Sequence, residues 1–508
     1  MDGEGLTRHR GLVTVCLMAA TVMQALDTTI ANVALPYMQG SLSTTLDQIN
    51  WVLTSYIVAA AIMTAPVGWL AMRFGTRRLL CISAAGFTVA SMLCGIAQSL
   101  GDMVLYRLLQ GVFGAALVPL SQAVMMAIYP VERRGQAMAI WGMGVIMGPI
   151  LGPTLGGWLT DTWSWRWVFF VNLPFGIGTV LGLLAFMRET PLRRGTPFDW
   201  FGFAALSIGI GALQLMLDRG ETLGWFESAE VVTEAIVTVV GLWIFLGHSL
   251  TARRPFIPIV IFADRNFTVG VIFMFMVGVI LLATLALVTP FLQGVVGYPV
   301  LTAGYLLGSR GCGTMLTMMV VGRLLRVVDA RILVFLGILA SAGSSWIFVR
   351  LAPETSVVSF VATSILQGVG LGFLFVPLNT VAFATLPAHL RTEATAVWSL
   401  IRNIGSAVGV SIVVARLSSG TTLMHARLAE TLQPWNLGLA DPAAAVLKSP
   451  NGTGLAILDS MVTAQATLIA YSNDFLLMTC VALATVPLLA FMENGHPPAP
   501  PAPAQRRD

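Results

Sequence analysis

The chain contains a series of long apolar segments separated by short polar connections. Each segment approaches the length of about 20 apolar residues that a helix needs to cross a bilayer. Of the 508 residues, 56% are hydrophobic and 10% are charged, and the mean hydropathy is +0.83. This composition predicts an all-α polytopic membrane protein rather than a soluble domain. The fourteen segments are centred near residues 24, 62, 88, 115, 148, 177, 208, 241, 280, 314, 341, 371, 407 and 483.

The basic residues are distributed unevenly between the connections. With the N-terminus inside, the inner connections hold 19 of the 28 Lys and Arg residues and the outer ones hold 6, while Arg107, Arg310 and Arg402 lie within segments. This bias follows the positive-inside rule and predicts that both termini are cytoplasmic. The net charge of +4 is then a topology signal rather than a sign of nucleic-acid binding. We expect the first segment, residues 11–37, to remain as a span because its apolar run is too long for a signal peptide.

The sequence also repeats itself. Residues 32–40 (NVALPYMQG) align with residues 286–294 (ALVTPFLQG) at an offset of 254, and Trp141 aligns with Trp398 at an offset of 257. The repeat predicts two six-helix halves related by duplication. This is the plan of the major facilitator fold, in which the substrate site lies between the halves near the bilayer midplane.

Two segments, at about 200–218 and 231–252, have no counterpart in the repeat and bring the count to fourteen. In the outer connection, residues 423–432 have an amphipathic helical pattern. We therefore predict an N-terminal half at 1–190 that carries the proton coupling, two inserted helices at 191–265, a C-terminal half at 266–495 with a long outer connection at about 417–472, and a disordered Pro- and Ala-rich tail at 496–508.

A carboxylate, Asp27, lies in the interior of the first segment. A charged side chain at the centre of a membrane helix costs roughly 2.5 to 3.5 kcal/mol on insertion scales, so it marks a functional site by default. The other acidic residues are expected at segment ends or in the polar connections. If protons drive this protein, Asp27 is the first candidate for the residue that carries them.

Several stretches resemble the motifs of one transporter family. They are LDTTIANVALP at 26–36, LYRLLQG at 105–111, GPILGPTLGG at 148–157, WRWVFFVNLP at 165–174 and YSNDF at 471–475. In this order they are similar to the motifs of the fourteen-helix drug:proton antiporters of the major facilitator superfamily, the EmrB/QacA subfamily, and most of all to its EmrB branch. The resemblance implies multidrug efflux across the bacterial inner membrane, which confers antibiotic resistance, with a periplasmic adaptor and an outer-membrane channel as possible partners. It also implies that Arg107 takes part in proton transfer.

The chemistry of coupling can be built from two of these residues. A carboxylate that alternates between paired and unpaired surroundings can take up and release a proton. Arg107 is the natural partner of Asp27, because a lone guanidinium at that depth is as costly as a lone carboxylate. Asp27 aligns with Leu281 and Arg107 aligns near Ser364, so both charges occur in one half. This asymmetry favours proton coupling in the N-terminal half, although a permanent pair that only holds helices together is the alternative.

The Gly- and Pro-rich motif of the fifth segment has a mechanical interpretation. Glycines at every fourth position allow another helix to approach closely, and prolines permit a bend. In the resembling family this helix packs against the other half and limits leak, and generic close packing is the alternative. The motif residues are Gly148, Pro149, Gly152, Pro153, Gly156 and Gly157.

The inner loop after the second segment departs from the superfamily pattern. Met72 stands where that pattern has an aspartate, which removes the usual carboxylate of the gating network. We therefore interpret the arginines of this loop as topology determinants. The loop residues are Gly68, Arg73, Gly75, Arg77 and Arg78.

The predicted substrate is a hydrophobic or amphiphilic drug-like compound. Methionine and aromatic surfaces accommodate varied apolar ligands, and the excess of basic over acidic groups inside favours anionic or neutral amphiphiles over cations. For each of these positions, ordinary membrane core is the alternative. The candidate lining residues are Met23, Gln24, Asn32, Tyr56, Gln110, Met143, Met147, Gln293, Arg310, Asn379, Trp398, Arg402 and Asn403.

Other classes of protein fit less well. The single lysine, Lys448, follows Leu447, so the P-loop of an ATP-driven pump is absent. The five histidines lack the spacing of metal ligands or of an enzyme site, and the five cysteines are expected to be small core residues. We therefore predict no enzyme, no metal and no cofactor, with the proton gradient as the energy source. A transporter of the same fold that imports or exports a specific metabolite is the main alternative, and a receptor is a more distant one.

Overall fold

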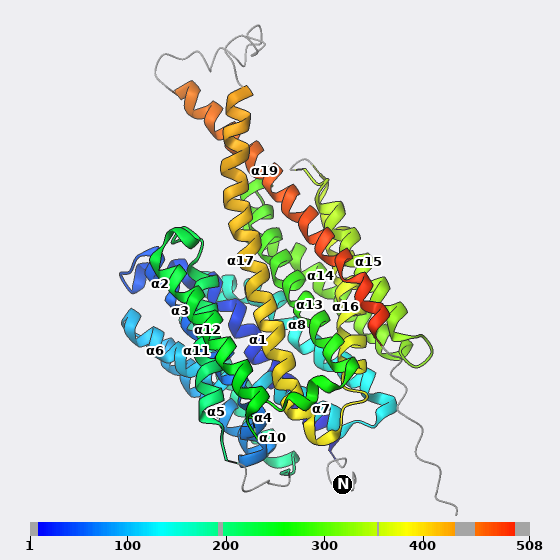
Figure 1. Ribbon diagram of the computed structural model, residues 1–508. Helices are drawn as coiled ribbons and strands as arrows, with labels where there is room; N and C mark the ends of the chain where they lie inside the picture. Colours follow the sequence, from blue (N-terminus) through cyan, green and yellow to red (C-terminus); the bar gives the residue numbers. More distant parts are fainter. Residues whose placement is uncertain (1–8, 191–196, 254, 353–354, 432–452, 493–508) are drawn as a thin grey trace, which may run out of the picture.

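The computed structural model is a helical bundle (Figure 1) and describes residues 9–190, 197–253, 255–352, 355–431 and 453–492. No strand occurs in this part of the chain. Twelve helices in it are long and apolar enough to cross a membrane, or up to thirteen when the bent pair α3 and α4 is included. A further helix, α14, has 25 residues but carries two arginines. The predicted all-α, multi-pass class is confirmed, while the count of fourteen spans is confirmed only approximately.

The helices are joined by short connections. The first part of the chain forms α1 (Arg10–Ser41), α2 (Leu46–Ile49), α3 (Trp51–Thr64), α4 (Val67–Phe74), α5 (Thr76–Ile96), α6 (Leu100–Gly114), α7 (Leu117–Ile128), α8 (Arg134–Thr162), α9 (Trp167–Phe170) and α10 (Asn172–Phe186). The middle forms α11 (Trp200–Arg219) and α12 (Ala229–Thr251). The last part forms α13 (Arg265–Pro290), α14 (Val300–Leu324), α15 (Ala330–Phe348), α16 (Val357–Val381), α17 (Arg391–Thr431) and α19 (Thr453–Ala484).

Short polar residues and proline set several helix ends. Ser99 and Asp102 form a capping box at the start of α6, which satisfies backbone N–H groups that the helix itself leaves unpaired. Asp199 and Asp264 cap α11 and α13 with a single side-chain hydrogen bond each, accepted from the backbone N–H groups of Gly202 and Phe267. Pro66 lies at the break between α3 and α4, where the chain bends by 60°. These signals are local, which is why the segments could be located from sequence.

The two halves use the same close helix contact. A Cβ on Gly148 would overlap the backbone of Ala25, so α8 lies directly against α1. In the C-terminal half, Gly405 and Gly409 of α17 lie against the backbone of α13 in the same manner. Glycine permits this approach because it has no side chain to separate the backbones. Gly405 and Gly409 align with Gly148 and Gly152 at the repeat offset of 257, so glycines at equivalent positions of the repeat make the same kind of contact.

The inserted helices α11 and α12 form a hairpin beside the bundle. They meet at Gly209 and Gly241, whose backbones approach too closely for side chains on either residue. The hairpin contacts both halves, since α11 packs on α3 and on α17, and Ser411 of α17 donates a hydrogen bond of 2.8 Å to the carbonyl of Leu217.

The seam between the halves is formed largely by α8 and α14. Along α14, positions 304, 311 and 318 face α8 at intervals of seven residues, where they meet Thr154, Ile150 and Gly142. Across the same seam, the ring of Trp141 stacks on Phe375 with centroids 5.8 Å apart. Gln122 Nε2 donates a hydrogen bond of 2.6 Å to Asn379 Oδ1, and both side chains are fully buried. The halves are thus held together by apolar packing and by this amide pair.

The predicted outer connection at 417–472 is wrong in its secondary structure. Instead of a loop with a separate amphipathic helix at 423–432, α17 continues unbroken to Thr431 and α19 already begins at Thr453. The two helices project together beyond the bundle (Figure 1), and His425 of α17 is 3.0 Å from Asp459 of α19. Polar faces allow both helices to extend past the apolar layer. Residues 432–452 and the predicted tail at 496–508 lie outside the described residues.

The cysteines are only partly core residues. Cys16, Cys81 and Cys94 are buried, but Cys312 and Cys480 are exposed on the surface of the bundle. An apolar segment in a membrane has a lipid-facing side, so membership of a span does not imply burial within the protein.

Candidate functional site

Asp27 is fully buried in the middle of α1. Its helix is fixed on both sides of this residue by α8: Gly148 lies against Ala25, and Thr29 Oγ1 donates a 3.0 Å hydrogen bond to the carbonyl of Gly148. Gly152 comes equally close to Thr29. The glycine stripe of α8 therefore positions the stretch of α1 that carries the carboxylate.

Arg107 pairs directly with Asp27. Its Nη1 is 2.6 Å from Asp27 Oδ2, and the two side chains are 1% and 0% exposed. The guanidinium lies near two aromatic rings, 5.3 Å from the centroid of Tyr56 and 4.9 Å from that of Phe169. Such rings stabilise a desolvated cation through their electron-rich faces. The structure thus brings together the two residues that the sequence singled out.

Two amides complete the shell of the carboxylate. Gln110 Nε2 donates a hydrogen bond of 2.9 Å to Asp27 Oδ1, and its Oε1 accepts one of 2.8 Å from Arg107 Nη1. Asn172 Nδ2 donates a hydrogen bond of 3.2 Å to the same Oδ1 and one of 2.9 Å to Ser91 Oγ. Both carboxylate oxygens are therefore occupied by donors from α6 and α10, as a buried charge requires.

Asn172 and Ser91 are site residues that sequence analysis missed. Asn172 lies in the fourth of the quoted motif stretches, residues 165–174, where the sequence identifies it only as part of a motif and not as a ligand of the carboxylate. The available signal was an amide in an apolar segment. Gln110 was predicted to line the substrate path, and the structure places it in the carboxylate cluster instead.

The arrangement allows the Asp27 carboxylate to be protonated in one state and negatively charged in the other. In the charged state Asp27 accepts from Arg107, Gln110 and Asn172. A proton on the carboxylate would remove its attraction for the guanidinium and free Arg107 to move. Because α1, α6 and α10 each contribute to the cluster, protonation would change contacts among three helices at once.

The C-terminal half contains two further buried guanidinium groups. Arg310 is 7% exposed, and its Nη2 donates a hydrogen bond of 3.1 Å to the carbonyl of Leu281. Arg402, which is 9% exposed, is 3.4 Å from Asn403 Oδ1 through Nη2, and its Nη1 has no hydrogen-bond partner. Within the described residues, neither group forms an ion pair.

A buried acidic residue in the C-terminal half corrects the expectation that Asp27 is nearly alone. Asp474 is almost fully buried in α19 and accepts a 3.4 Å bond from Arg416 of α17. With the outer connection expected at about 417–472, residue 474 falls at the end of the last apolar segment, where the sequence predicts exposed acidic residues. The early start of α19 at Thr453 instead places Asp474 well inside a helix.

The remaining candidate lining residues are dispersed. Gln24 donates 3.0 Å to the hydroxyl of Tyr56, which connects both to the Asp27 cluster. Asn32 is exposed, and Trp398 is buried among Phe267 and Phe383 within the C-terminal half, so neither has the predicted position at a shared cavity. Asn379 lies at the seam. Met23 is buried, and Met143, Met147, Gln293 and Asn403 are half-buried.

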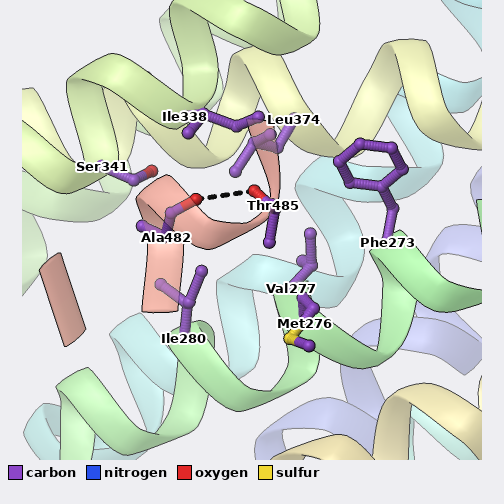
Figure 2. A pocket seen from close by; sticks show the side chains of 9 residues that line it. All are labelled: Phe273, Met276, Val277, Ile280, Ile338, Ser341, Leu374, Ala482 and Thr485. Carbon is purple, nitrogen blue, oxygen red and sulfur yellow. Dashed lines mark hydrogen bonds between the residues drawn. The ribbon is translucent and has the colours of Figure 1, made fainter. Parts of the chain in front are cut away.

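A small cavity lies inside the C-terminal half rather than between the halves (Figure 2). It has a volume of about 10 Å³ and lies between α13, α15, α16 and α19. Thr485 Oγ1 there donates 2.7 Å to the carbonyl of Ala482. The walls are otherwise mostly apolar, and the space is at the lower limit for a single water molecule. This cavity is too small for a drug-like substrate. Its lining residues are Phe273, Met276, Val277, Ile280, Ile338, Ser341, Leu374, Ala482 and Thr485.

The glycines of the Gly- and Pro-rich motif pack within their own half. Gly148, Gly152 and Gly156 face α1 of the same half, and nothing lies within 4 Å of a Cβ on Gly157. The contact of α8 with the other half is instead made by neighbouring residues, among them Ile150. The expected packing against the other half is therefore a property of α8 but not of the glycine stripe.

The inner loop has a carboxylate that the sequence did not suggest. Glu189, beyond the end of α10, accepts 3.0 Å bonds from the backbone N–H groups of Arg77 and Arg78. It thereby caps α5 at Gly75, whose φ of +90° favours glycine. Gly68 meets Glu393 of α17, and a Cβ there would be 2.8 Å from its Cα. Arg73 and Arg78 are exposed, and Arg77 donates 2.6 Å to the carbonyl of Leu184.

Comparison with known proteins places this fold and site. The family model described as Major Facilitator Superfamily matches residues 17–410. The chain is 36% identical over 481 residues to the fatty acid resistance protein FarB of Neisseria gonorrhoeae, covering 94% of this chain and 95% of that protein. It is 36% identical over 428 residues to the multidrug export protein EmrB of Haemophilus influenzae, covering 84% of each. The structure of the human organic anion transporter MFSD10 (TETRAN) has the same fold, with a TM-score of 0.58, 13% identity, and coverage of 94% of this chain and 100% of that one.

The bundle of long apolar helices defines a multi-pass membrane protein, and the matched family is one of transporters. The chain belongs to the Major Facilitator Superfamily and, within it, to the family of the EmrB multidrug export proteins.

Proposed function

We propose that this protein is a proton-coupled exporter that exchanges protons for hydrophobic or amphiphilic drug-like compounds. It is a transporter rather than an enzyme, it needs no cofactor, and the proton gradient supplies the energy. The observation that carries this proposal is the buried cluster in which Asp27 is paired with Arg107 at 2.6 Å. A buried pair contributes little net stability to a fold, so its presence in the middle of a membrane helix indicates a role in transport.

The cluster supports coupling because it connects Asp27, through α1 and α8, to the seam between the two halves. Asp27 lies on the stretch of α1 that packs on Gly148 and Gly152 of α8. The same α8 forms the seam with α14 of the other half. A change in the charge of Asp27 therefore acts one helix away from the surface along which the halves must separate for alternating access.

The substrate class is supported by the chain's relatives and its interior. EmrB of Haemophilus influenzae is named for multidrug export and FarB for fatty acid resistance. Export of hydrophobic or amphiphilic drug-like compounds by this chain is consistent with both names. Such compounds suit an interior in which buried apolar residues outnumber buried polar ones.

The cellular setting is the bacterial inner membrane, with both termini in the cytoplasm. This orientation places the projecting ends of α17 and α19 on the periplasmic side (Figure 1). Leu423, Leu455 and Met461 are exposed on that projection, which provides apolar contacts for a periplasmic adaptor and, through it, an outer-membrane channel.

The test is flux in inside-out vesicles under an imposed proton gradient, with the neutral dye N-phenyl-1-naphthylamine as substrate. Native protein should accumulate the dye, and Asp27→Asn should abolish accumulation while dye binding persists. Asp161→Asn is the matched control, because Asp161 is exposed and only accepts a hydrogen bond from Tyr37. Equal accumulation in native and Asp27→Asn vesicles would refute Asp27 as the proton carrier, and gradient-driven movement out of the vesicles would indicate an importer.

A further inference from the structure

The C-terminal half contains buried positive charge without a counter-charge. Arg310 and Arg402 are each at least nine-tenths buried, and Arg402 Nη1 has no hydrogen-bond partner. Asp474, a buried carboxylate of this half, is already paired with Arg416. Glu393 is nine residues from Arg402 along α17, or about 13 Å at 1.5 Å per residue. The described part of this half therefore offers neither guanidinium a carboxylate.

An uncompensated guanidinium within a membrane protein requires an explanation. The N-terminal half gives its own buried arginine a carboxylate, Asp27, and an amide oxygen of Gln110, so the charge is neutralised. Methionine or leucine at positions 310 and 402 would pack without any such cost. A charge that the protein does not neutralise is available to a ligand that carries the opposite charge.

Arg310 has the better-defined position of the two. Its side chain reaches from α14 to α13, where it donates to the carbonyl of Leu281. At the repeat offset of 254, Arg310 corresponds to Tyr56 and Leu281 corresponds to Asp27. The guanidinium thus lies in the C-terminal half where the carboxylate cluster lies in the other. The next residue, Gly311, faces Ile150 across the seam, so Arg310 is adjacent to the boundary between the halves.

We propose that Arg310 binds the acidic group of the transported compound, and that the preferred substrate is an anionic amphiphile: one carboxylate or similar acid on a long apolar body. This inference rests on the proposed export function and specifies its substrate. The acid displaces the Leu281 carbonyl and accepts two parallel hydrogen bonds from the guanidinium fork. Arg402 contributes a second buried positive charge beside α13, where its backbone lies against Gly278, less than one helical turn from Leu281.

The experiment measures equilibrium binding to the full chain in phosphatidylcholine nanodiscs without a proton gradient. Three probes share a twelve-carbon chain and differ in the head group: dodecanoate, 1-dodecanol and dodecyltrimethylammonium. Empty nanodiscs give the contribution of lipid partitioning. The variants are Arg310→Gln, Arg310→Lys and the control Arg427→Gln, which removes the same charge from an exposed position on α17.

The native protein should bind dodecanoate more tightly than the other probes. Arg310→Gln should weaken dodecanoate binding about tenfold, the loss typical of a hydrogen bond to a charged group, and leave dodecanol binding unchanged. Arg310→Lys should lose about threefold, because ammonium keeps the charge without the fork, and this variant gives the answer if Arg310→Gln does not fold. Unchanged dodecanoate binding in both Arg310 variants, or an equal loss in the control, would overturn the proposal.

The outcomes separate this inference from the proposed function. If vesicles accumulate the neutral dye in an Asp27-dependent way but dodecanoate binding ignores Arg310, export stands and the anion site is wrong. If dodecanoate binding depends on Arg310 and no flux follows the proton gradient, the anion site stands and proton-coupled export is wrong.

Discussion

The two halves share a packing plan and treat buried charge in opposite ways. In the N-terminal half, Arg107 is neutralised by Asp27, Gln110 forms hydrogen bonds with both, and Asn172 donates to Asp27. In the C-terminal half, Arg310 has a backbone carbonyl as its partner. Duplication preserved the helix contacts while the side chains diverged. A closed set of partners suits a residue that exchanges a proton, and an open one suits a residue that binds a ligand.

The largest effect should come from removing the counter-charge of Asp27 in the N-terminal half. Arg107→Leu leaves Asp27 buried without its counter-charge, which typically costs about 3–5 kcal/mol. The double variant with Asp27→Leu and Arg107→Leu should recover most of that stability, because apolar replacement of a buried pair is often neutral. Transport should be absent in both. Thermal unfolding in detergent and dye flux in vesicles measure the two properties separately.

The double variant also decides between the two interpretations of the pair. If it is as stable as the native protein and does not transport, the pair is functional. A double variant that transports normally would show that Asp27 and Arg107 only hold helices together.

The converse test gives Arg310 a carboxylate partner within the protein. Leu281→Asp introduces a carboxylate on the residue whose carbonyl already accepts from Arg310. This internal anion should compete with dodecanoate and weaken its binding by about tenfold or more, the order expected for a charge-assisted hydrogen bond. Leu281→Asn is the matched control, since it adds a polar group of equal size without charge. Equal effects of Asp and Asn would contradict competition by charge.

A smaller effect should follow from disturbing the contact that both halves share. Gly148→Ala introduces a Cβ into the backbone of Ala25 and should destabilise the protein by about 1–3 kcal/mol, as overpacking usually does. Displacement of α1 should also reduce flux, because Asp27 lies two residues further along. Gly157→Ala has nothing within 4 Å of the new Cβ and should behave as native. Comparable unfolding temperatures for the two variants would show that the contact is not tight in solution.

Particular residues show which parts of the site and fold could be predicted from the sequence. Asp27 and Arg107 were identifiable because charges inside apolar segments are rare, and their partnership followed from cost alone. Asn172 was missed because an amide in a span has no such cost signature. The helical continuation of α17 to Thr431 was missed because a polar helix beyond the apolar layer resembles a loop in composition. The position of Glu189 depends on tertiary packing of α10 against α5, which local sequence does not encode.

The smallest effect should come from the outer shell of the carboxylate. Asn172→Leu removes the 3.2 Å bond to Asp27 and the 2.9 Å bond to Ser91, but Arg107 and Gln110 still occupy the carboxylate. We expect a decrease in flux of about threefold to tenfold, the equivalent of one hydrogen bond, with dye binding unchanged. Ser91→Ala, which removes the second of these bonds but leaves Asn172 beside Asp27, should have a smaller effect. Because Asn172 touches the proton site and not Arg310, Asn172→Leu should leave dodecanoate binding at the native level; a loss there equal to that in Arg310→Gln would mean that proton and substrate sites are not divided between the halves.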